Sequence, residues 1–121
     1  MSSLQDKTGA EVTVQPTSDG RAFDIEIVAD GVTAGRTFFL DHDGERILYH
    51  TEVDEAYGGR GLATILVREA LEASRKDDLV IVPVCPLVKG FLDKNGEDFT
   101  AQGGEFRRAT LDDIAFVQNS I

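Results

Sequence analysis

Apolar and polar residues alternate through much of the first half of the chain, which is the pattern of strands that bury one face. The alternation is brief in residues 11–15. It is clearer in residues 21–28, where Phe23, Ile25 and Ile27 share one face and acidic residues occupy the other. These segments therefore predict two strands of a half-buried sheet.

Two turn-forming sequences extend this pattern. The pair Asp-Gly at 30–31 and the sequence DHDG at 41–44 separate strand-like runs at 32–40 and 46–53. Gly35 interrupts the first of these runs, so we expect a bulge there. Together the runs predict an antiparallel meander of three or four strands.

The hydrophobic period changes after residue 53. A glycine-rich loop, YGGRG at 57–61, is followed by apolar residues at helical spacing up to about residue 74. Residues 79–84, LVIVPV, form a nearly continuous apolar run, which is typical of a strand buried on both faces. The second half of the chain therefore predicts a helix and a strand, and the fold class is α/β.

Two more helices are expected toward the C-terminus. Pro86 suits the first turn of a helix, which we expect to end at Asn95-Gly96. A last amphipathic segment begins with Thr110 as a plausible N-cap, and Asp113 follows three residues later as in a capping box. No repeat or low-complexity stretch interrupts this order.

Length and charge narrow the function. The 121 residues predict a single domain, 1–121, whose polar residues 1–9 we expect to be frayed. The chain has 22 acidic and 12 basic residues, a net charge of −10. This balance argues against nucleic-acid and anionic-membrane partners, which need clustered Lys and Arg, and favours a cationic partner.

Cysteine content and hydropathy exclude several kinds of site. Cys85 is the only cysteine, so an internal disulfide or a cysteine-built metal centre is excluded, and we expect no metal. No window approaches the roughly 18 apolar residues of a membrane span, and the N-terminus lacks the pattern of a secretory signal. We therefore expect a cytoplasmic protein.

The glycine-rich loop has chemistry of its own. Glycines allow positive φ and a close approach of the backbone to a ligand, and the first N–H groups of the following helix are unpaired. Such a loop can bind a pyrophosphate, with Arg60 adding a positive charge at its rim. The alternative is an ordinary tight turn. No Lys-Ser/Thr follows, so the loop is not a P-loop, and no parallel crossover precedes it, as a dinucleotide fingerprint requires.

Three motifs carry a resemblance to a known family. VDEAYGGRGLATILV at 53–67 resembles the acetyl-CoA loop of the GNAT superfamily of N-acetyltransferases. HTEV at 50–53 and VPVCPLVKGFL at 82–92 are similar to the His-Thr-x-Val and Pro-x-Cys motifs of its very small subfamily. The resemblance covers residues from about 23 to 95. It implies a small, mixed, mostly antiparallel sheet with two main helices, and residues 99–121 form a short helical extension beyond it.

The resemblance also implies how acetyl-CoA is held, as a cosubstrate. The pantetheine arm would lie between the splayed strands 46–53 and 79–84, where Val53 offers backbone groups. Gly58 stands where Gln or Arg is usual, which removes one side-chain contact. The remaining implied cofactor-binding residues are those of the loop and the first helical turn: Gly59, Arg60, Gly61, Leu62, Ala63 and Thr64.

Three residues are catalytic candidates. Cys85 could accept the acetyl group, line the thioester pocket, or be a small buried side chain. His50 and Glu52 share a strand face about 7 Å apart. Either could take a proton from an ammonium group once burial brings its pKa near 7. A structural, hydrogen-bonded histidine is the alternative for His50.

The function implied is transfer of an acetyl group from acetyl-CoA to a small-molecule or protein amine. The alternative is a module that binds CoA or acetyl-CoA as a sensor or interaction domain with little transferase activity. A third reading is a structural interaction domain that binds no CoA. We expect a cationic acceptor and a monomer or weak homodimer.

Overall fold

A computed structural model describes residues 4–121 and contains one mixed sheet. The strands are β1 (Leu4–Gln5), β2 (Glu11–Pro16), β3 (Ala22–Ile27), β4 (Val32–His42), β5 (Glu45–Val53) and β6 (Val80–Pro83). They lie in the sheet in the order in which they follow one another in the chain, and only β5 and β6 pair in parallel. The predicted antiparallel meander followed by a buried strand is confirmed, and the structure pairs that strand in parallel with β5.

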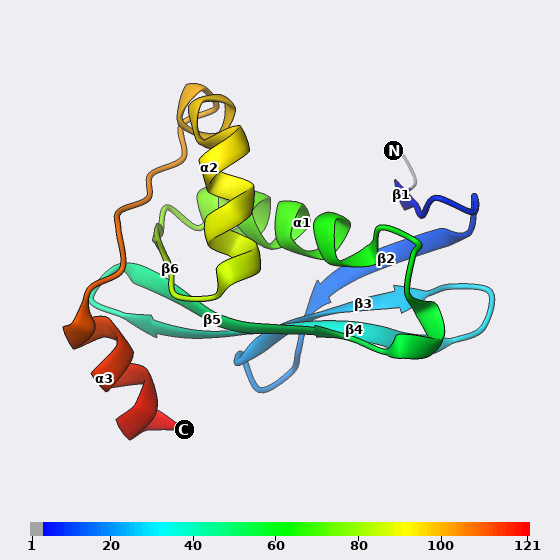
Figure 1. The fold of residues 1–121 in the computed structure, drawn as a ribbon, viewed down its shortest axis with the longest axis horizontal. Coiled ribbons are helices and arrows are strands. Elements are labelled where there is room, and N and C mark those ends of the chain that lie inside the picture. Colours follow the sequence, from blue (N-terminus) through cyan, green and yellow to red (C-terminus); the bar gives the residue numbers. More distant parts are fainter. Residues whose placement is uncertain (1–3) are drawn as a thin grey trace.

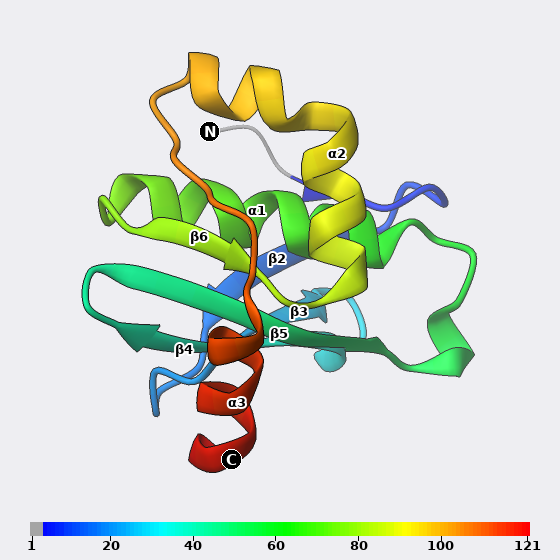
Figure 2. The same cartoon turned by 60° about the vertical axis from the view of Figure 1, so that its left-hand side comes forward.

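The helices lie on both faces of this sheet (Figures 1 and 2). They are the short 3₁₀ helix η1 (Glu55–Tyr57), then α1 (Leu62–Lys76), α2 (Pro86–Ala101) and α3 (Leu111–Ser120). α1 and α2 cover one face, and α3 lies on the opposite face beside β5. The expected architecture, a small α/β fold with two main helices and a C-terminal helical extension, is confirmed.

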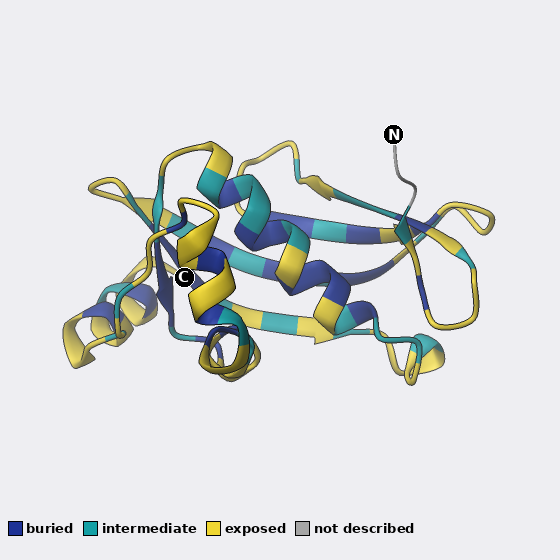
Figure 3. Cartoon of the chain, turned by 90° about the horizontal axis from the view of Figure 1, so that it is seen from above, coloured by how far each residue is buried: buried dark blue, intermediate teal, exposed yellow. Residues whose placement is uncertain are grey.

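Most of the core lies between the sheet and α1. Its largest members have no measurable exposure and include Ile25, Leu48, Leu66 and Ile81. Figure 3 shows buried segments of α1 and of the strands beneath it in dark blue, whereas most of the turns are exposed. A smaller cluster of Ile47, Val82 and Val117 holds α3 against the other face of the sheet.

The expected fraying of residues 1–9 is wrong for residues 4–9, and residues 1–3 lie outside the described part of the chain. Leu4 pairs with Val12 of β2. Asp6 is buried and accepts hydrogen bonds from the N–H groups of Thr8 and Ala10, which closes a turn. Those bonds lower the pKa of Asp6, the largest contribution coming from the Thr8 hydroxyl. The segment is ordered because one short carboxylate satisfies three donors.

The expected end of the second helix at Asn95-Gly96 is also wrong, because α2 continues to Ala101. Asn95 donates to the Phe91 carbonyl one turn earlier, so its side chain supports the helix. Gly96 lies under the ring of Phe106, where a Cβ would come within 2.8 Å of the ring. Gly96 therefore meets a packing requirement inside the helix, although in the sequence it resembles a helix stop.

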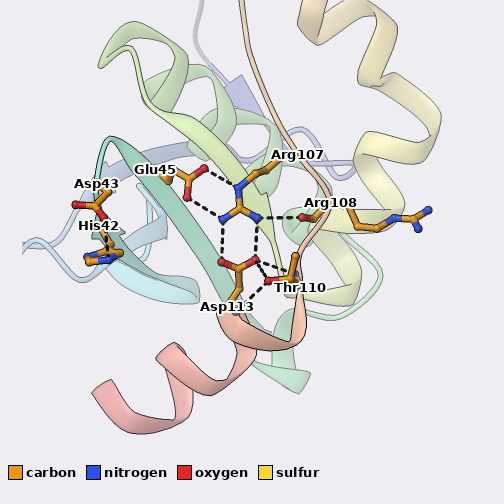
Figure 4. Close-up of polar contacts among 7 residues, drawn as sticks. All are labelled: His42, Asp43, Glu45, Arg107, Arg108, Thr110 and Asp113. Atoms are coloured by element: carbon orange, nitrogen blue, oxygen red, sulfur yellow. Dashed lines mark hydrogen bonds and ion pairs between the residues drawn. The ribbon is translucent and has the colours of Figure 1, made fainter.

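An edge contact and an ionic cluster attach the C-terminal extension to the sheet, in addition to the apolar cluster around Val117. Ile81 N–H donates to Glu105 and Arg107 N–H donates to Ile81, which adds a short parallel bridge beside β6. The guanidinium of Arg107 then binds Glu45 of β5 and Asp113 of α3 at 2.6 to 2.8 Å (Figure 4). The predicted capping box at the start of α3 is present.

Candidate active site

A bulge in β5 opens the sheet at the place where the motifs meet. His50 pairs with Phe38 of β4, but the next pair joins Leu48 to Phe39, so Tyr49 is an extra residue. On the other side, β5 pairs with β6 only as far as Leu48. The sequence predicted a bulge in β4, where the register shift leaves Ala34 unpaired beside Gly35, and gave no signal for the bulge at Tyr49.

The two parallel strands part beyond Leu48. The N–H groups of Val84 and Cys85 both donate to the Leu48 carbonyl, at 3.0 and 2.8 Å, and the chain then turns into α2. The N–H of Asp54 points back to β4, where it donates to the Ala34 carbonyl. Because backbone groups alternate in direction along a strand, those of Thr51 and Val53 face the opening. The structure thus places the backbone of Val53 at the gap.

The glycine-rich loop forms a cradle of backbone N–H groups. Gly59 and Gly61 have φ of 80° and 75°, and Gly61 is the N-cap of α1. Within residues 4–121, no N–H from Gly59 through Thr64 donates to another protein group. These consecutive donors lie at the positive end of a helix of 15 residues, which is the arrangement that binds a phosphate oxygen.

Arg60 is not the free cation at the rim that the sequence suggested. Its guanidinium lies 3.6 Å from the buried Asp6 carboxylate and stacks over the Tyr57 ring, 5.2 Å from the centroid. Its carbonyl accepts from the N–H of Lys7, and the Lys7 stem lies against Gly61. The N-terminal segment therefore supports the loop from outside and partly neutralises Arg60.

A shallow groove continues from the cradle between α1 and α2. It has a volume of about 280 Å³. Its lining residues come from the first turns of α1 and the outward side of α2: Ala63, Thr64, Val67, Leu87, Gly90, Phe91, Lys94 and Asn95. Of the predicted cofactor residues, Ala63 and Thr64 line this groove, whereas the Leu62 side chain is buried in the core.

Cys85 lies at the helix side of the opening. It is 3% exposed, it is the N-cap residue of α2, and its thiol lies 3.3 Å from the Thr51 hydroxyl. The Thr51 hydroxyl in turn lies 2.8 Å from that of Thr37 on β4. The two subfamily-like motifs thus meet through Thr51 and Cys85. No signal in the sequence marks Thr51 as a residue of the site.

His50 and Glu52 point to the other face of the sheet. They share that face as predicted, and His50 Nε2 lies 3.3 Å from Glu52 Oε2. Their side chains are 55% and 63% exposed, so the burial expected to tune them is absent. The three predicted catalytic residues therefore do not form one cluster, because Cys85 lies on the helix face and the other two on the α3 face.

A second groove, of about 540 Å³, lies beside His50 and is mostly apolar. β4 and β5 contribute Phe38, Tyr49 and His50; Val84 stands where β6 has ended; and α3 and the residue after it contribute Ile114, Val117, Gln118 and Ile121. Burial raises the pKa of the Tyr49 phenol. Sequence reasoning missed this groove because it depends on where α3 docks.

The described residues give two further findings. No group of three or more His, Cys, Asp or Glu side chains among residues 4–121 converges in a way that could hold a metal ion. None of the helices in that same part of the chain is long and apolar enough to cross a membrane.

Comparison with known proteins connects this geometry to a family. A model of the family described as GCN5-related N-acetyl-transferase matches residues 23–101. Protein NATD1 of Mus musculus is 29% identical over 89 residues, which cover 72% of this chain and 79% of the relative. Protein NATD1 of Bos taurus is 30% identical over 89 residues, with coverages of 72% and 77%.

A solved structure agrees on the fold. A protein of Staphylococcus aureus, determined by NMR in solution and described as GCN5-like, aligns with a TM-score of 0.57 at 19% identity. The alignment covers 82% of this chain and 91% of that chain. The matched family region ends at residue 101, so α3 and the side of the groove that it forms lie beyond that region.

Proposed function

The chain belongs to the family of GCN5-related N-acetyltransferases, and we propose that it transfers an acetyl group from acetyl-CoA to an amine. The observation that carries the proposal is the row of N–H groups from Gly59 through Thr64, which donate to no group within residues 4–121 and lie next to a gap between β5 and β6. A diphosphate fits the first feature, and an extended pantetheine arm fits the second.

The residues present fit this cosubstrate. The N–H groups at the start of α1 would hold the diphosphate, and the groove reaching Lys94 would receive the nucleotide end. Gly59 has open space where a Cβ would stand, so the backbone can approach a ligand closely. The Val53 backbone would hydrogen-bond the arm and orient the thioester carbonyl. Acetyl-CoA, when bound, supplies the acetyl thioester.

Glu52 is the proposed proton acceptor. The net reaction forms one C–N bond and breaks one C–S bond. The ammonium acceptor loses two protons, of which one is released and the other ends on the thiol of the departing CoA. The Glu52 carboxylate lies beside the opening on the α3 face and can accept the released proton directly or through water. His50, in contact with Glu52, orients the carboxylate. Cys85 lines the thioester side and takes no covalent part.

We also assign the chain to the very small subfamily with the His-Thr-x-Val and Pro-x-Cys motifs. What supports this finer assignment is the contact between the Cys85 thiol and the Thr51 hydroxyl, one residue from each motif. Two motifs that are far apart in the sequence are therefore in contact in the fold.

Two measurements test the proposed function. Isothermal titration with acetyl-CoA should give a dissociation constant below about 1 mM, the upper end of usual enzyme affinities for substrates. Release of free CoA thiol should then depend on added amine, with the acetylated product identified by mass spectrometry. Binding without turnover across a broad amine and peptide panel would favour the sensor module. Absence of binding would reject both.

A further inference from the structure

We infer that the groove formed by α3 selects the acceptor, and that the acceptor is a primary amine carrying an apolar group. This inference rests on the proposed function, and it names the substrate class of the same site. It starts from the place of the groove, because His50 and Val84, which line it, stand where β5 and β6 part. An occupant of the groove would reach the gap from the face opposite Cys85.

The lining indicates an apolar occupant. Phe38 stacks on the His50 ring with centroids 5.8 Å apart and lies 6.0 Å from the Tyr49 ring, which gives an aromatic floor. Ile114 of α3 forms a wall and is 38% exposed. A volume of about 540 Å³ admits a small apolar group and is an ordinary size for a ligand site.

Charge indicates where the amine lies. The Glu52 carboxylate, in contact with His50 at the edge of the groove, is the nearest anionic group on this stretch of β5. Arg36, whose guanidinium lies over the Phe38 ring and which pairs across the strands with Glu52, is bound through two hydrogen bonds by Asp24. An ammonium at Glu52 with its apolar substituent over Phe38 therefore satisfies both parts of the site. The chain charge of −10 favours approach of such a cation.

The decisive experiment is a chain-length series of acceptors. Propylamine, butylamine, pentylamine and hexylamine differ only in methylenes that the groove would cover. Each added methylene should raise kcat/KM about two- to fourfold, or roughly 8- to 64-fold across the series. Spermidine, which is long but cationic throughout, should be a poorer acceptor than hexylamine.

A matched pair of variants locates the effect. Ile114→Asn makes the groove wall polar at a partly exposed position, so it should flatten the chain-length series while leaving acetyl-CoA affinity unchanged. Leu111→Asn makes the same kind of change on the same helix, at a residue that is 84% exposed and outside the groove. That control should retain the full chain-length dependence.

Direct binding gives a readout separate from turnover. In the ¹⁵N-labelled protein, hexylamine should shift the amide resonances of His50 and Ile114 in the wild type and not in Ile114→Asn. A flat series, or spermidine exceeding hexylamine, would overturn the inference and leave the proposed function standing. Turnover of no amine would instead reject the proposed function. A concentration-dependent dimer that Ile114→Asn disrupts, with no hexylamine binding, would assign the groove to a second copy of the chain.

Discussion

The two faces of β5 beyond its bulge differ in how they are built. On the helix face, Cys85 is buried and Thr51 is half-buried, the thiol of the first lies within hydrogen-bond distance of the hydroxyl of the second, and the groups proposed to bind acetyl-CoA are backbone. On the α3 face, His50 and Glu52 are exposed side chains, and the wall comes from the C-terminal extension. One face is thus fixed by the family fold, whereas the other depends on a segment outside the matched region.

Because the two faces differ in this way, acetyl-CoA affinity and acceptor use should respond to different substitutions. A cofactor bound by backbone N–H groups tolerates many side-chain changes, because the donors belong to the loop and helix geometry. An acceptor bound by exposed side chains and a docked helix is sensitive to single substitutions. Variants on one face should therefore change acetyl-CoA affinity, and variants on the other should change acceptor use.

The largest expected effect is a loss of acetyl-CoA affinity caused by a substitution at Ala63, on the helix face of the sheet. Ala63→Glu puts a carboxylate in the first turn of α1, next to the proposed diphosphate. At about 5 Å and an effective dielectric constant of about 20, each charge pair costs about 3 kcal/mol, so acetyl-CoA affinity should fall more than 100-fold. Titration calorimetry measures the loss.

The fold should survive this change. Ala63 is only partly buried, and an acidic residue near a helix N-terminus is favourable. Ala115→Glu, at an exposed position of α3, is the matched control and should bind acetyl-CoA like the wild type. Gly61→Asp is a poorer test, because the φ of 75° and the Lys7 contact would strain the variant. Unchanged affinity in Ala63→Glu would contradict the cradle.

The contrast also explains what the sequence could predict. The meander, the loop, the buried strand and the α3 cap are local patterns, so residues such as Ile25, Gly61 and Thr110 revealed them. The bulge at Tyr49 leaves no local pattern, because it is a mismatch with β4. Gly96 has the chemistry of a helix stop, and only Phe106, ten residues later, accounts for it.

The candidate site likewise has one part that the sequence predicts and another that it does not. The cofactor cradle follows from glycines and a helix start that adjoin in the chain, so it was predictable. The side of the sheet to which Cys85 points, relative to His50, depends on how β6 ends and α2 begins. The groove required knowing that Arg107 holds α3 beside β5 through Glu45 and Asp113.

The next effect concerns the α3 face alone. Glu52→Gln keeps the shape of the side chain and removes the proton acceptor, so kcat/KM for hexylamine should fall roughly 100-fold at pH 7.5, with acetyl-CoA affinity unchanged. Alkylammonium groups titrate near the lysine value of about 10.4, so the free amine rises about tenfold per pH unit and should rescue the variant by pH 9.5.

Glu26→Gln, at an exposed position of β3, is the control for removal of a negative charge from a strand. It should change kcat/KM by less than about twofold, as a distant surface charge does at moderate salt. A Glu52→Gln deficit that persists unchanged at pH 9.5 would assign Glu52 to positioning of the acceptor.

A smaller effect tests the attachment of α3. The Arg107 guanidinium, with help from the Thr110 cap, holds the pKa of the Asp113 carboxyl well below its usual range. Asp113→Asn should therefore lower the free energy of unfolding by about 1–2 kcal/mol at pH 7. Urea denaturation measures the change, and Asp112→Asn, at an exposed residue of the same helical turn, is the control.

The pH dependence has a definite sign. A carboxyl whose pKa is depressed in the folded state stabilises the fold above its ordinary value of about 3.9, and the contribution is lost as the pH falls toward the folded pKa. The difference between wild type and Asp113→Asn should thus be complete at pH 6 and shrink below about pH 4. A difference that stays constant down to pH 2 would remove the ion pair as its cause.

The smallest expected effect tests whether the helix face takes part in chemistry. Cys85→Ala removes a buried thiol that contacts Thr51 and leaves a small void, so unfolding free energy should fall by about 1 kcal/mol. Because Cys85 and Glu52 point to opposite faces of the sheet, the proposed direct transfer needs no thiol. Turnover should drop less than about threefold, whereas loss of a covalent nucleophile costs orders of magnitude. Cys85→Ser, which keeps a polar group beside Thr51, should behave like Cys85→Ala in turnover. A labelled acetyl group trapped on Cys85 of the wild type after rapid quenching would reverse this assignment and make the buried face of β5 the reactive one.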